Sequence, residues 1–203
     1  MSPTKTAAKP ATKAGPTLRP APPEPVADRD LEDLHPFVLP RAQAVLDELR
    51  GGGFDPLPTE VLRTNERQAW LHALGRTTVA PDGRGRGGAV VTRARTAATT
   101  WHGYRLAFDI VDRRILYNLR HPRWGQWTAA LAAAARTHGF RWGADWDNDG
   151  STADESFLDW PHLQLLAGPT GLVIPRSPSA TDQADHARGA LHRVFARYGL
   201  AAA

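Results

Sequence analysis

The sequence predicts an α+β fold: a small antiparallel sheet flanked by helices, behind a disordered N-terminal tail. Three observations carry this prediction. Segments with helical periodicity are interspersed with short strand-like segments that are not adjacent in the chain. The segment 106–111 alternates large apolar residues with smaller or polar ones, as a half-buried strand does. The first 36 residues differ in composition from all that follow.

The predicted tail is rich in Pro, Ala, Thr and Lys. Residues 1–25 contain seven of the chain's 17 prolines, and the chain's only lysines are Lys5, Lys9 and Lys13. Such a segment buries too little apolar surface to offset the entropy of ordering it, so it serves as a linker or as a basic tether to a polyanion. We therefore divide the chain into a tail (1–36), a domain (37–175) and a C-terminal helical extension (176–203).

Caps and glycines set the element boundaries in the first half of the domain. Residues 41–50 have a helical pattern that ends at three consecutive glycines. Residues 60–63 are a short strand candidate. Thr64 or Asn65 then caps a helix that runs to about Leu74 and ends at Gly75. Residues 80–90, rich in Gly and Arg, are typical of a mobile loop.

The second half contains two strands and two further helices. The strand 106–111 is followed by an Ala-rich helix over 125–138, which Gly139 ends. An acidic loop occupies 143–157, and residues 162–166 form a second strand. The last element is an amphipathic helix over 182–198.

Composition excludes several classes of protein. The chain of 203 residues has no cysteine, so disulfides and Cys-ligated zinc are both excluded. The net charge of +4 favours an anionic partner, but basic and aromatic residues are not interleaved as in nucleic-acid-binding surfaces. No apolar run reaches the length of a membrane span, and the N-terminus lacks the apolar stretch of a secretory signal. Any export would use another route.

A first polar cluster surrounds the strand 106–111. The segment 100–109 reads Thr-Trp-His-Gly-Tyr-Arg-Leu-Ala-Phe-Asp. Strand alternation puts Leu106, Phe108 and Ile110 in the core, with Arg105 and Asp109 on the opposite face. His102 precedes the strand, and the glycine after it lets the backbone bend so that the ring turns toward Asp109.

A second cluster, Asp159-Trp160-Pro161-His162, begins the other strand. Pro161 cannot donate to a sheet ladder, so regular pairing starts at His162, whose face Gln164 shares. Asp159 lies before the proline in a turn, which places its carboxylate beside the site. Two imidazoles, one carboxylate ligand and one spare carboxylate are what a catalytic zinc site on the sheet face requires. Asp159 suits the base that deprotonates the attacking water and later protonates the leaving amine.

These motifs resemble the M15 family of zinc peptidases, whose signature is S-x-H-x-x-G-x-A-x-D followed by [DE]-x-x-H. The likeness is greatest to its L-alanyl-D-glutamate endopeptidases and phage endolysins, relatives of the D-alanyl-D-alanine carboxypeptidases. Residues 61–68 resemble their L-R-T-x-x-R-Q segment, residues 139–146 their G-L-x-W-G-G-D-W, and residues 162–165 their H-F-x-L; Val91-Thr92 precedes the first motif. The resemblance spans about residues 37–166 in the same order.

The resemblance implies Zn²⁺ held by His102, Asp109 and His162, with Asp159 as the base. It also implies Arg63 as the cation that faces the scissile carbonyl oxygen. We add Thr100, Arg105, Gln68 and Trp160 as candidate substrate-binding residues. This list includes two departures from the family pattern, Thr in place of Ser at 100 and Arg in place of Gly at 105.

The departure at Arg105 has two possible consequences. Strand phase turns the side chain toward the metal face, or else the backbone avoids a conformation that glycine favours. A guanidinium near zinc repels the metal, yet it can bind a substrate carboxylate through two hydrogen bonds. Arg105 therefore either impairs catalysis or alters specificity.

We expect a zinc-dependent peptidase that acts on the peptide stem of peptidoglycan in the cell wall, cutting between L-Ala and D-Glu. The alternatives are a D,D-carboxypeptidase of the same family and a catalytically impaired module that binds the cell wall.

Two further features carry weaker expectations. Asp145, Asp147 and Asp149 fit the opening D-x-D-x-D-G of a calcium loop, but the twelfth position is Ser156 in place of Glu, and a solvated acidic turn would look the same. The chain also has seven tryptophans, several next to the motifs. They pack in the core or wall a groove for a sugar–peptide polymer.

Overall fold

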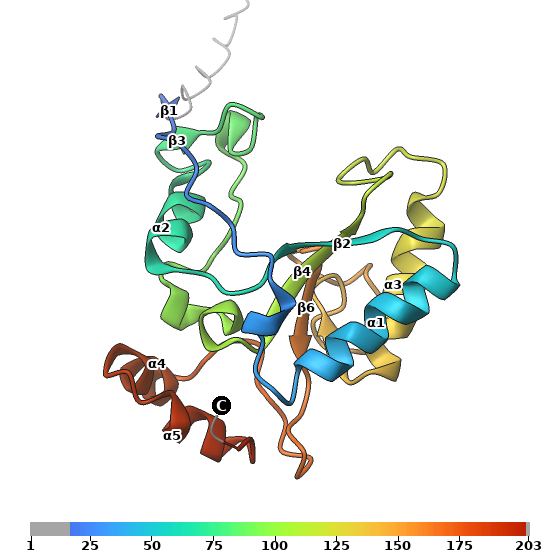
Figure 1. Ribbon diagram of the computed structural model, residues 1–203. Helices are drawn as coiled ribbons and strands as arrows, with labels where there is room; N and C mark the ends of the chain where they lie inside the picture. The colour runs from blue at the N-terminus through green and yellow to red at the C-terminus, as the bar shows by residue number, and fades with distance from the viewer. Residues whose placement is uncertain (1–16, 202–203) are drawn as a thin grey trace, which may run out of the picture. The chain divides into compact units, whose positions relative to one another are not determined.

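The computed structural model describes residues 17–201, and it shows the predicted mixture of helices with a small antiparallel sheet (Figure 1). These residues form two compact units: one contains 17–24 and 70–93, the other 25–69 and 94–201. The predicted boundaries at 36 and 175 are therefore not the boundaries of compact units. The part of the predicted tail before residue 17 lies outside the described residues.

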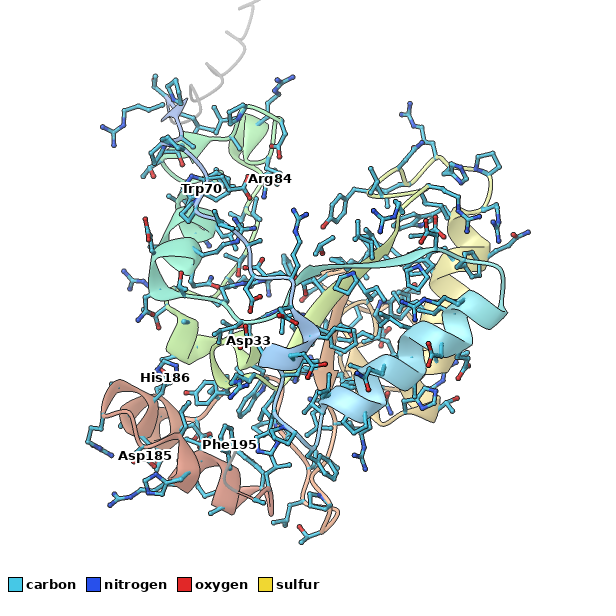
Figure 2. All side chains as sticks on the ribbon, viewed as in Figure 1. Asp33, Trp70, Arg84, Asp185, His186 and Phe195 are labelled. Carbon is cyan, nitrogen blue, oxygen red and sulfur yellow. The ribbon has the colours of Figure 1, made fainter. Side chains whose placement is uncertain are left out.

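The smaller unit has a minimal sheet and a small core of its own. Strand β1 (Arg19–Pro20) pairs in parallel with β3 (Thr78–Val79), and η2 (Arg86–Gly88) follows. Its core contains Trp70, Leu71, Leu74 and Ala80. The indole N–H of Trp70 donates to the Pro22 carbonyl over 2.9 Å, and the guanidinium of Arg84 lies 5.0 Å from the indole ring (Figure 2).

The larger unit is built on a four-stranded antiparallel sheet in the order β2-β4-β6-β5. The strands are β2 (Pro56–Glu60), β4 (Ala107–Asp112), β5 (Phe140–Trp142) and β6 (His162–Leu165). The two prolines of β2 are tolerated because β2 is an edge strand. The strand predicted at 60–63 therefore lies earlier in the chain. After Glu60 the backbone turns away, because Asp28 accepts the N–H groups of Val61 and Leu62.

Helices α1 (Leu39–Gly51) and α3 (Trp124–Thr137) pack against each other beside the sheet (Figure 1). The helix predicted from Thr64 or Asn65 is α2 (Asn65–Ala73), and the Thr64 hydroxyl accepts the N–H of Arg67. The core contains Val45 and Leu49 of α1, Leu131 of α3, Phe108 of β4 and Leu163 of β6. Leu106, Phe108 and Ile110 are fully buried, and Ala107, Asp109 and Val111 are buried too, so both faces of β4 are covered. Asp109 and His162 are direct partners, so they share one face as predicted.

The helix predicted over 182–198 is two helices, α4 (Ala180–Ala187) and α5 (Leu191–Arg197). Gly189 adopts a φ of 69°, and Ala190 N–H returns to the Asp185 carbonyl, so the chain turns between them. Phe195 and His186 show how this segment is attached (Figure 2): Phe195 belongs to the main core, and the His186 ring bonds the Gly103 carbonyl. Residues 180–197 are thus part of the larger unit and not a separate extension.

Three short 3-10 helices complete this unit: η1 (Leu31–Asp33), η3 (Ala97–Thr99) and η4 (Trp101–Tyr104). Helix η4 is buried along its whole length. The Trp101 indole N–H donates to the Pro175 carbonyl, and the Tyr104 hydroxyl donates to the Ala98 carbonyl. Because both ends of this helix are anchored, His102 is held in a fixed position next to the sheet.

Candidate metal centre

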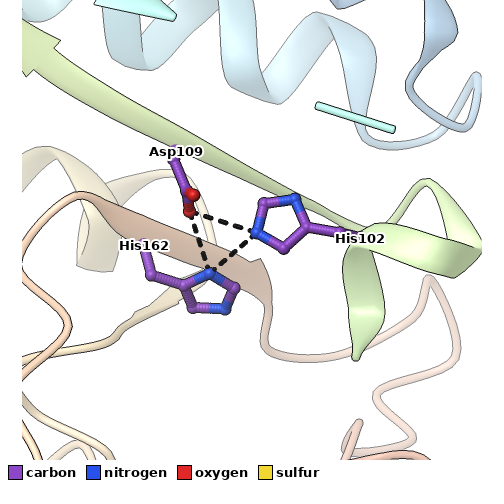
Figure 3. Close-up of side chains that lie close together, drawn as sticks. All are labelled: His102, Asp109 and His162. Carbon is purple, nitrogen blue, oxygen red and sulfur yellow. Dashed lines mark hydrogen bonds and ion pairs between the residues drawn. The ribbon is translucent and has the colours of Figure 1, made fainter. Parts of the chain in front are cut away.

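Three side chains from different elements meet on one face of the sheet (Figure 3). His102 comes from η4, Asp109 from β4 and His162 from β6, where Asp109 and His162 are direct cross-strand partners. His102 Nε2, His162 Nδ1 and Asp109 Oδ1 lie 3.1 Å from one another in all three pairs. The residues are 0%, 5% and 8% exposed, so this triangle is shielded from most solvent.

The hydrogen bonds behind the two imidazoles fix which nitrogen faces the triangle. His102 Nδ1 lies 2.8 Å from the Val61 carbonyl oxygen, which can only accept, so Nδ1 carries the proton. His162 Nε2 lies 3.2 Å from Gln164 Oε1, and the Gln164 amide nitrogen donates to the Pro175 carbonyl. Gln164 therefore presents an oxygen to His162. Both rings direct an unprotonated nitrogen into the triangle.

The electrostatics of the triangle favour a cation. With both rings neutral, two nitrogen lone pairs and one carboxylate oxygen converge with no proton between them. Burial and the Arg63 charge lower the pKa of His102. Burial opposes ionisation of Asp109, but the two histidines and Arg63 hold its pKa well below its usual range. Burial also disfavours charge on His162, yet the negative charge of the neighbouring Asp109 carboxylate raises its pKa, as expected where acceptors outnumber protons.

The donor set and its spacing fit zinc. In a tetrahedral zinc site, ligand atoms about 2.0–2.1 Å from the metal lie about 3.3–3.4 Å from one another. The observed separations of 3.1 Å approach this value. Two neutral imidazole nitrogens and one carboxylate oxygen are also a ligand set of catalytic zinc sites, which keep a fourth position open. Each ring has the outer hydrogen bond that such ligands require.

Arg63 lies beside the triangle, in the turn between β2 and α2. Its Nε and Nη2 donate to the two Glu60 carboxylate oxygens over 2.9 and 3.1 Å, and Nη2 also donates to Asp109 Oδ2 over 3.1 Å. Nη1 donates to Gln68 Oε1 over 3.2 Å. Four of its five N–H groups are therefore used within the described chain, and one on Nη1 is left for an external acceptor.

Asp159 lies in the turn before β6, next to the triangle. Burial and the Asp109 carboxylate raise the pKa of Asp159 to about 6, although His162 and Arg63 act in the opposite direction. The approach of this turn depends on Gly143. A Cβ at position 143 would lie 2.5 Å from the Asp159 carbonyl oxygen and 2.9 Å from His162 Cβ, distances that no side chain tolerates.

The expected orientation of Arg105 is wrong. Its backbone has a φ of 63°, the left-handed conformation that glycine favours, because it ends η4 one residue before the chain extends toward β4. Its side chain turns away from the ligand face, where Nε donates to the Asp33 carbonyl and Nη2 lies 3.5 Å from the carbonyls of Glu32 and Leu34. These bonds offset the strained backbone. The structure gives no support to a contact between Arg105 and substrate.

The other candidate substrate residues have different surroundings. Gln68 is fully buried, accepts from Arg63 and donates to the Ala94 carbonyl, so it positions Arg63 and is not placed to meet a ligand. Trp160 is partly buried, with its ring 5.6 Å from those of Trp124 and Trp142. Thr100 caps η4 through its backbone. Roles for Thr100 and Trp160 in substrate binding stay predictions.

The acidic loop behaves as a turn. Asp145, Asp147 and Asp149 do cluster. However, the two Asp145 oxygens accept the N–H groups of Asp149 and Gly150 over 3.0 Å, and Asp149 accepts that of Ser151 over 2.7 Å. Hydrogen bonds within the loop account for the carboxylates of Asp145 and Asp149, and calcium has no support beyond the proximity of the three residues.

Two residues support the site without having been predicted from the sequence to do so. Glu60 is 5% exposed and binds both Arg63 and Arg67, and Gln164 fixes the His162 tautomer. Strand phase alone indicated Gln164, since it shares the face of His162. The sequence pattern did not indicate Glu60, because it predicted a strand over 60–63, whereas Glu60 is the last residue of β2.

One family model and one solved structure show similarity to this chain. Residues 93–165 match the M15 peptidase family model described as D-alanyl-D-alanine carboxypeptidase. Among solved structures, the L-Ala D-Glu endopeptidase ChiX of Serratia marcescens matches with 20% identity and a TM-score of 0.44, over 70% of this chain and 87% of that one. The segment that matches the family model contains His102, Asp109 and His162. The segment 93–165 is therefore similar to the M15 family of peptidases.

Proposed function

We propose that this protein is a zinc-dependent peptidase that hydrolyses the peptide stem of peptidoglycan between L-Ala and D-Glu. The observation that carries the proposal is the convergence of three unprotonated ligand atoms, 3.1 Å apart, beside a carboxyl group whose pKa is raised to about 6. Such a set provides a metal site and a base next to each other.

Each residue of the centre has a distinct role in this proposal. His102, Asp109 and His162 hold the zinc ion, which when bound supplies a Lewis acid that activates water and polarises a carbonyl group. Asp159 accepts a proton from the attacking water and returns it to the departing amine. The free N–H of Arg63 Nη1 donates to the carbonyl oxygen as negative charge develops on it. Glu60 and Gln68 hold the Arg63 guanidinium in place.

The choice of scissile bond rests on sequence motifs. Residues 61–68 and 139–146 resemble segments of the endopeptidase branch. The matching family model is instead described as D-alanyl-D-alanine carboxypeptidase, which favours release of the terminal D-Ala as the second candidate. The two reactions give different products from the same wall material, so one digestion separates them.

The non-catalytic alternative loses its main argument. It depended on Arg105 repelling the metal, and the Arg105 side chain bonds to the carbonyls of residues 32–34 instead. The substrate places the reaction at the cell wall. Among residues 17–201, no helix combines the length and the apolar character needed to cross a bilayer.

The test is digestion of purified peptidoglycan followed by mass analysis of the fragments. Cleavage between L-Ala and D-Glu leaves L-Ala at the end of the glycan-linked stump, whereas carboxypeptidase action releases free D-Ala. A chelator should stop the reaction and added zinc should restore it. Wild-type protein that releases neither product would contradict the proposal.

Asp159→Asn tests the base. This variant should retain zinc and lose most of its hydrolysis, because general acid–base catalysis contributes about 100- to 10,000-fold. The matched control is Asp147→Asn, an exposed aspartate in the acidic loop, which should digest the wall normally. Normal digestion by Asp159→Asn would show that another group moves the proton.

A further inference from the structure

Arg141 is a buried cation that has no counter-charge among the residues that the structure describes. It lies on β5, is 7% exposed, and forms no ion pair with any residue between 17 and 201. Its Nη1 donates to the Ile174 carbonyl over 3.0 Å. Its Nε is buried without a hydrogen-bond partner, and Nη2 has no partner either in the described part of the chain. One edge of the guanidinium, formed by Nε and Nη2, is thus unused.

In Arg63, a residue of the same unit, the corresponding edge of the guanidinium binds a carboxylate. The Nε and Nη2 atoms of Arg63 donate hydrogen bonds to the two carboxylate oxygens of Glu60. This is the side-on pairing that a guanidinium forms with a carboxylate. Arg141 offers the same edge with no carboxylate on it. An unpaired buried charge is costly, so such groups are normally paired.

The surroundings of Arg141 are positive. Burial and the Arg176 guanidinium lower the pKa of Arg141. The side chain of Arg176 is about half exposed, and its acidic neighbour is Glu155, 4.0 Å away. Glu155 itself is engaged by the N–H groups of Trp146 and Asp147. The field around Arg141 therefore favours an added anion.

Arg141 lies on the same face of the sheet as the metal centre. Gln164 is the direct partner of both Arg141 on β5 and Ala107 on β4, and the neighbouring row contains Asp109 and His162. Direct cross-strand partners share a face, with Cβ atoms about 5 Å apart. Gln164 also bonds the His162 ring and the Pro175 carbonyl, next to the Ile174 carbonyl that Arg141 binds. One residue, Gln164, thus separates Arg141 from a zinc ligand.

We propose that Arg141 binds a carboxylate of the peptide substrate through its Nε and Nη2 edge and so helps determine specificity. The identity of this ligand rests on the proposed function, because the stem peptide of peptidoglycan carries several carboxylates. The alternative is that Arg141 only secures the segment 174–175. That role uses Nη1 alone and leaves the other edge without a purpose.

Equilibrium binding in zinc-loaded Asp159→Asn protein tests the proposal without turnover. Three synthetic stem peptides are compared by calorimetry: one with all carboxylates free, one amidated at the D-Glu α-carboxylate, and one amidated at the C-terminus. One amidation should weaken binding about tenfold, as expected for a charge-assisted hydrogen-bonded pair. Equal affinity for all three peptides would overturn the proposal, and this comparison requires no change at Arg141.

Substitutions then assign the effect to Arg141. In the same background, Arg141→Gln should bind the acid and the amide equally well, and Arg141→Lys should retain only part of the preference, because it keeps the charge and loses the fork. The control is Arg105→Gln, which removes another guanidinium bound to main-chain carbonyls and should leave the preference intact. Equal weakening of all three peptides by Arg141→Gln would identify a purely structural role.

The proposed peptidase function and the proposed Arg141 carboxylate site can fail independently, and the two failures give different results. Wild-type protein that prefers the acid but cleaves no wall material would refute the peptidase and still support the carboxylate site. Wild-type protein that cleaves the wall with no acid preference would do the reverse.

Discussion

Two groups of potential metal ligands in the larger unit differ in how their lone pairs are used. His102, Asp109 and His162 form one group, and the acidic loop residues Asp145, Asp147 and Asp149 form the other. In the first group the outward-facing ring nitrogens bond Val61 and Gln164, which leaves the inward-facing atoms free. In the second, Asp145 and Asp149 accept N–H groups of their own loop.

Ligand residue types alone therefore do not make a metal site. In both groups, each residue offers one ligand atom, and these atoms lie within 4.8 Å of one another. Only the first comes from separate elements whose packing forces acceptors together at 3.1 Å, at a cost that a cation removes. The loop residues lie within one turn and stabilise it.

The largest effect is expected from removing a ligand. His102→Ala should reduce zinc from about one ion per chain to a trace and lower hydrolysis about 1000-fold or more, since a bound metal ion supplies several kcal/mol. Metal analysis of the purified protein and wall digestion measure both quantities. Asp145→Asn is the matched change in the acidic loop and should retain zinc. Equal zinc loss in both variants would remove the contrast.

Removing the hydrogen bond behind a ligand should have a smaller effect on zinc binding than removing the ligand itself. Gln164→Leu removes the acceptor that fixes the His162 tautomer, so zinc affinity should fall about 10- to 100-fold, as for other outer hydrogen-bond partners. Competition with a chromophoric chelator measures the affinity. Glu155→Gln, which alters the acceptor of two loop N–H groups, should leave zinc affinity unchanged. Unchanged affinity in Gln164→Leu would mean that the tautomer does not depend on this bond.

Substituting a glycine near each group tests how far that group depends on the conformation of its backbone. Gly143→Ala places a methyl group against Asp159 and His162, so it should cost about 1–3 kcal/mol of stability and also weaken zinc binding. Gly150→Ala meets no atom within 4 Å but has a φ of 92°, so it should cost about 1–2 kcal/mol and leave zinc binding intact. Chemical denaturation and zinc titration of both variants separate these outcomes; zinc binding lost in both would contradict the contrast.

The smallest effect concerns the pH dependence of stability. The pKa of Asp159 rises from 3.8 to about 6 on folding, so its ionised form destabilises the folded, metal-free protein. Below about pH 4 the group is protonated in both states and Asp159→Asn changes little. Above about pH 6 the variant should be more stable by about 1–2 kcal/mol, less than the roughly 3 kcal/mol of the full shift, because the side chain is partly exposed. Melting temperatures in chelator across pH 4–8 test this sign; a variant less stable at pH 8 would contradict it.

The meeting of Asp109 with His162 could be predicted because strand alternation controls it. Alternation along β4 and β6 put Asp109 and His162 on one face and Phe108 and Leu163 in the core, and the structure agrees. Arg105 could not be predicted in this way, because β4 begins only at Ala107 and the end of η4 sets the Arg105 backbone. The division of the last helix at Gly189 likewise depended on a backbone turn that amphipathic periodicity did not reveal.

The fold class, the two strands that carry the centre and the candidate set of His102, Asp109 and His162 could be predicted from the sequence, because strand phase and the turn at Pro161 act over a few residues. The nitrogen of each histidine that faces the other two side chains, and the direction of Arg105, depend on the three-dimensional packing. The packing also decided that Glu60 and Gln164 support the site and that Arg141 has an unused edge on its face. These properties depend on hydrogen bonds between residues far apart in the chain, such as His102 to Val61 and Arg141 to Ile174, which no local pattern encodes.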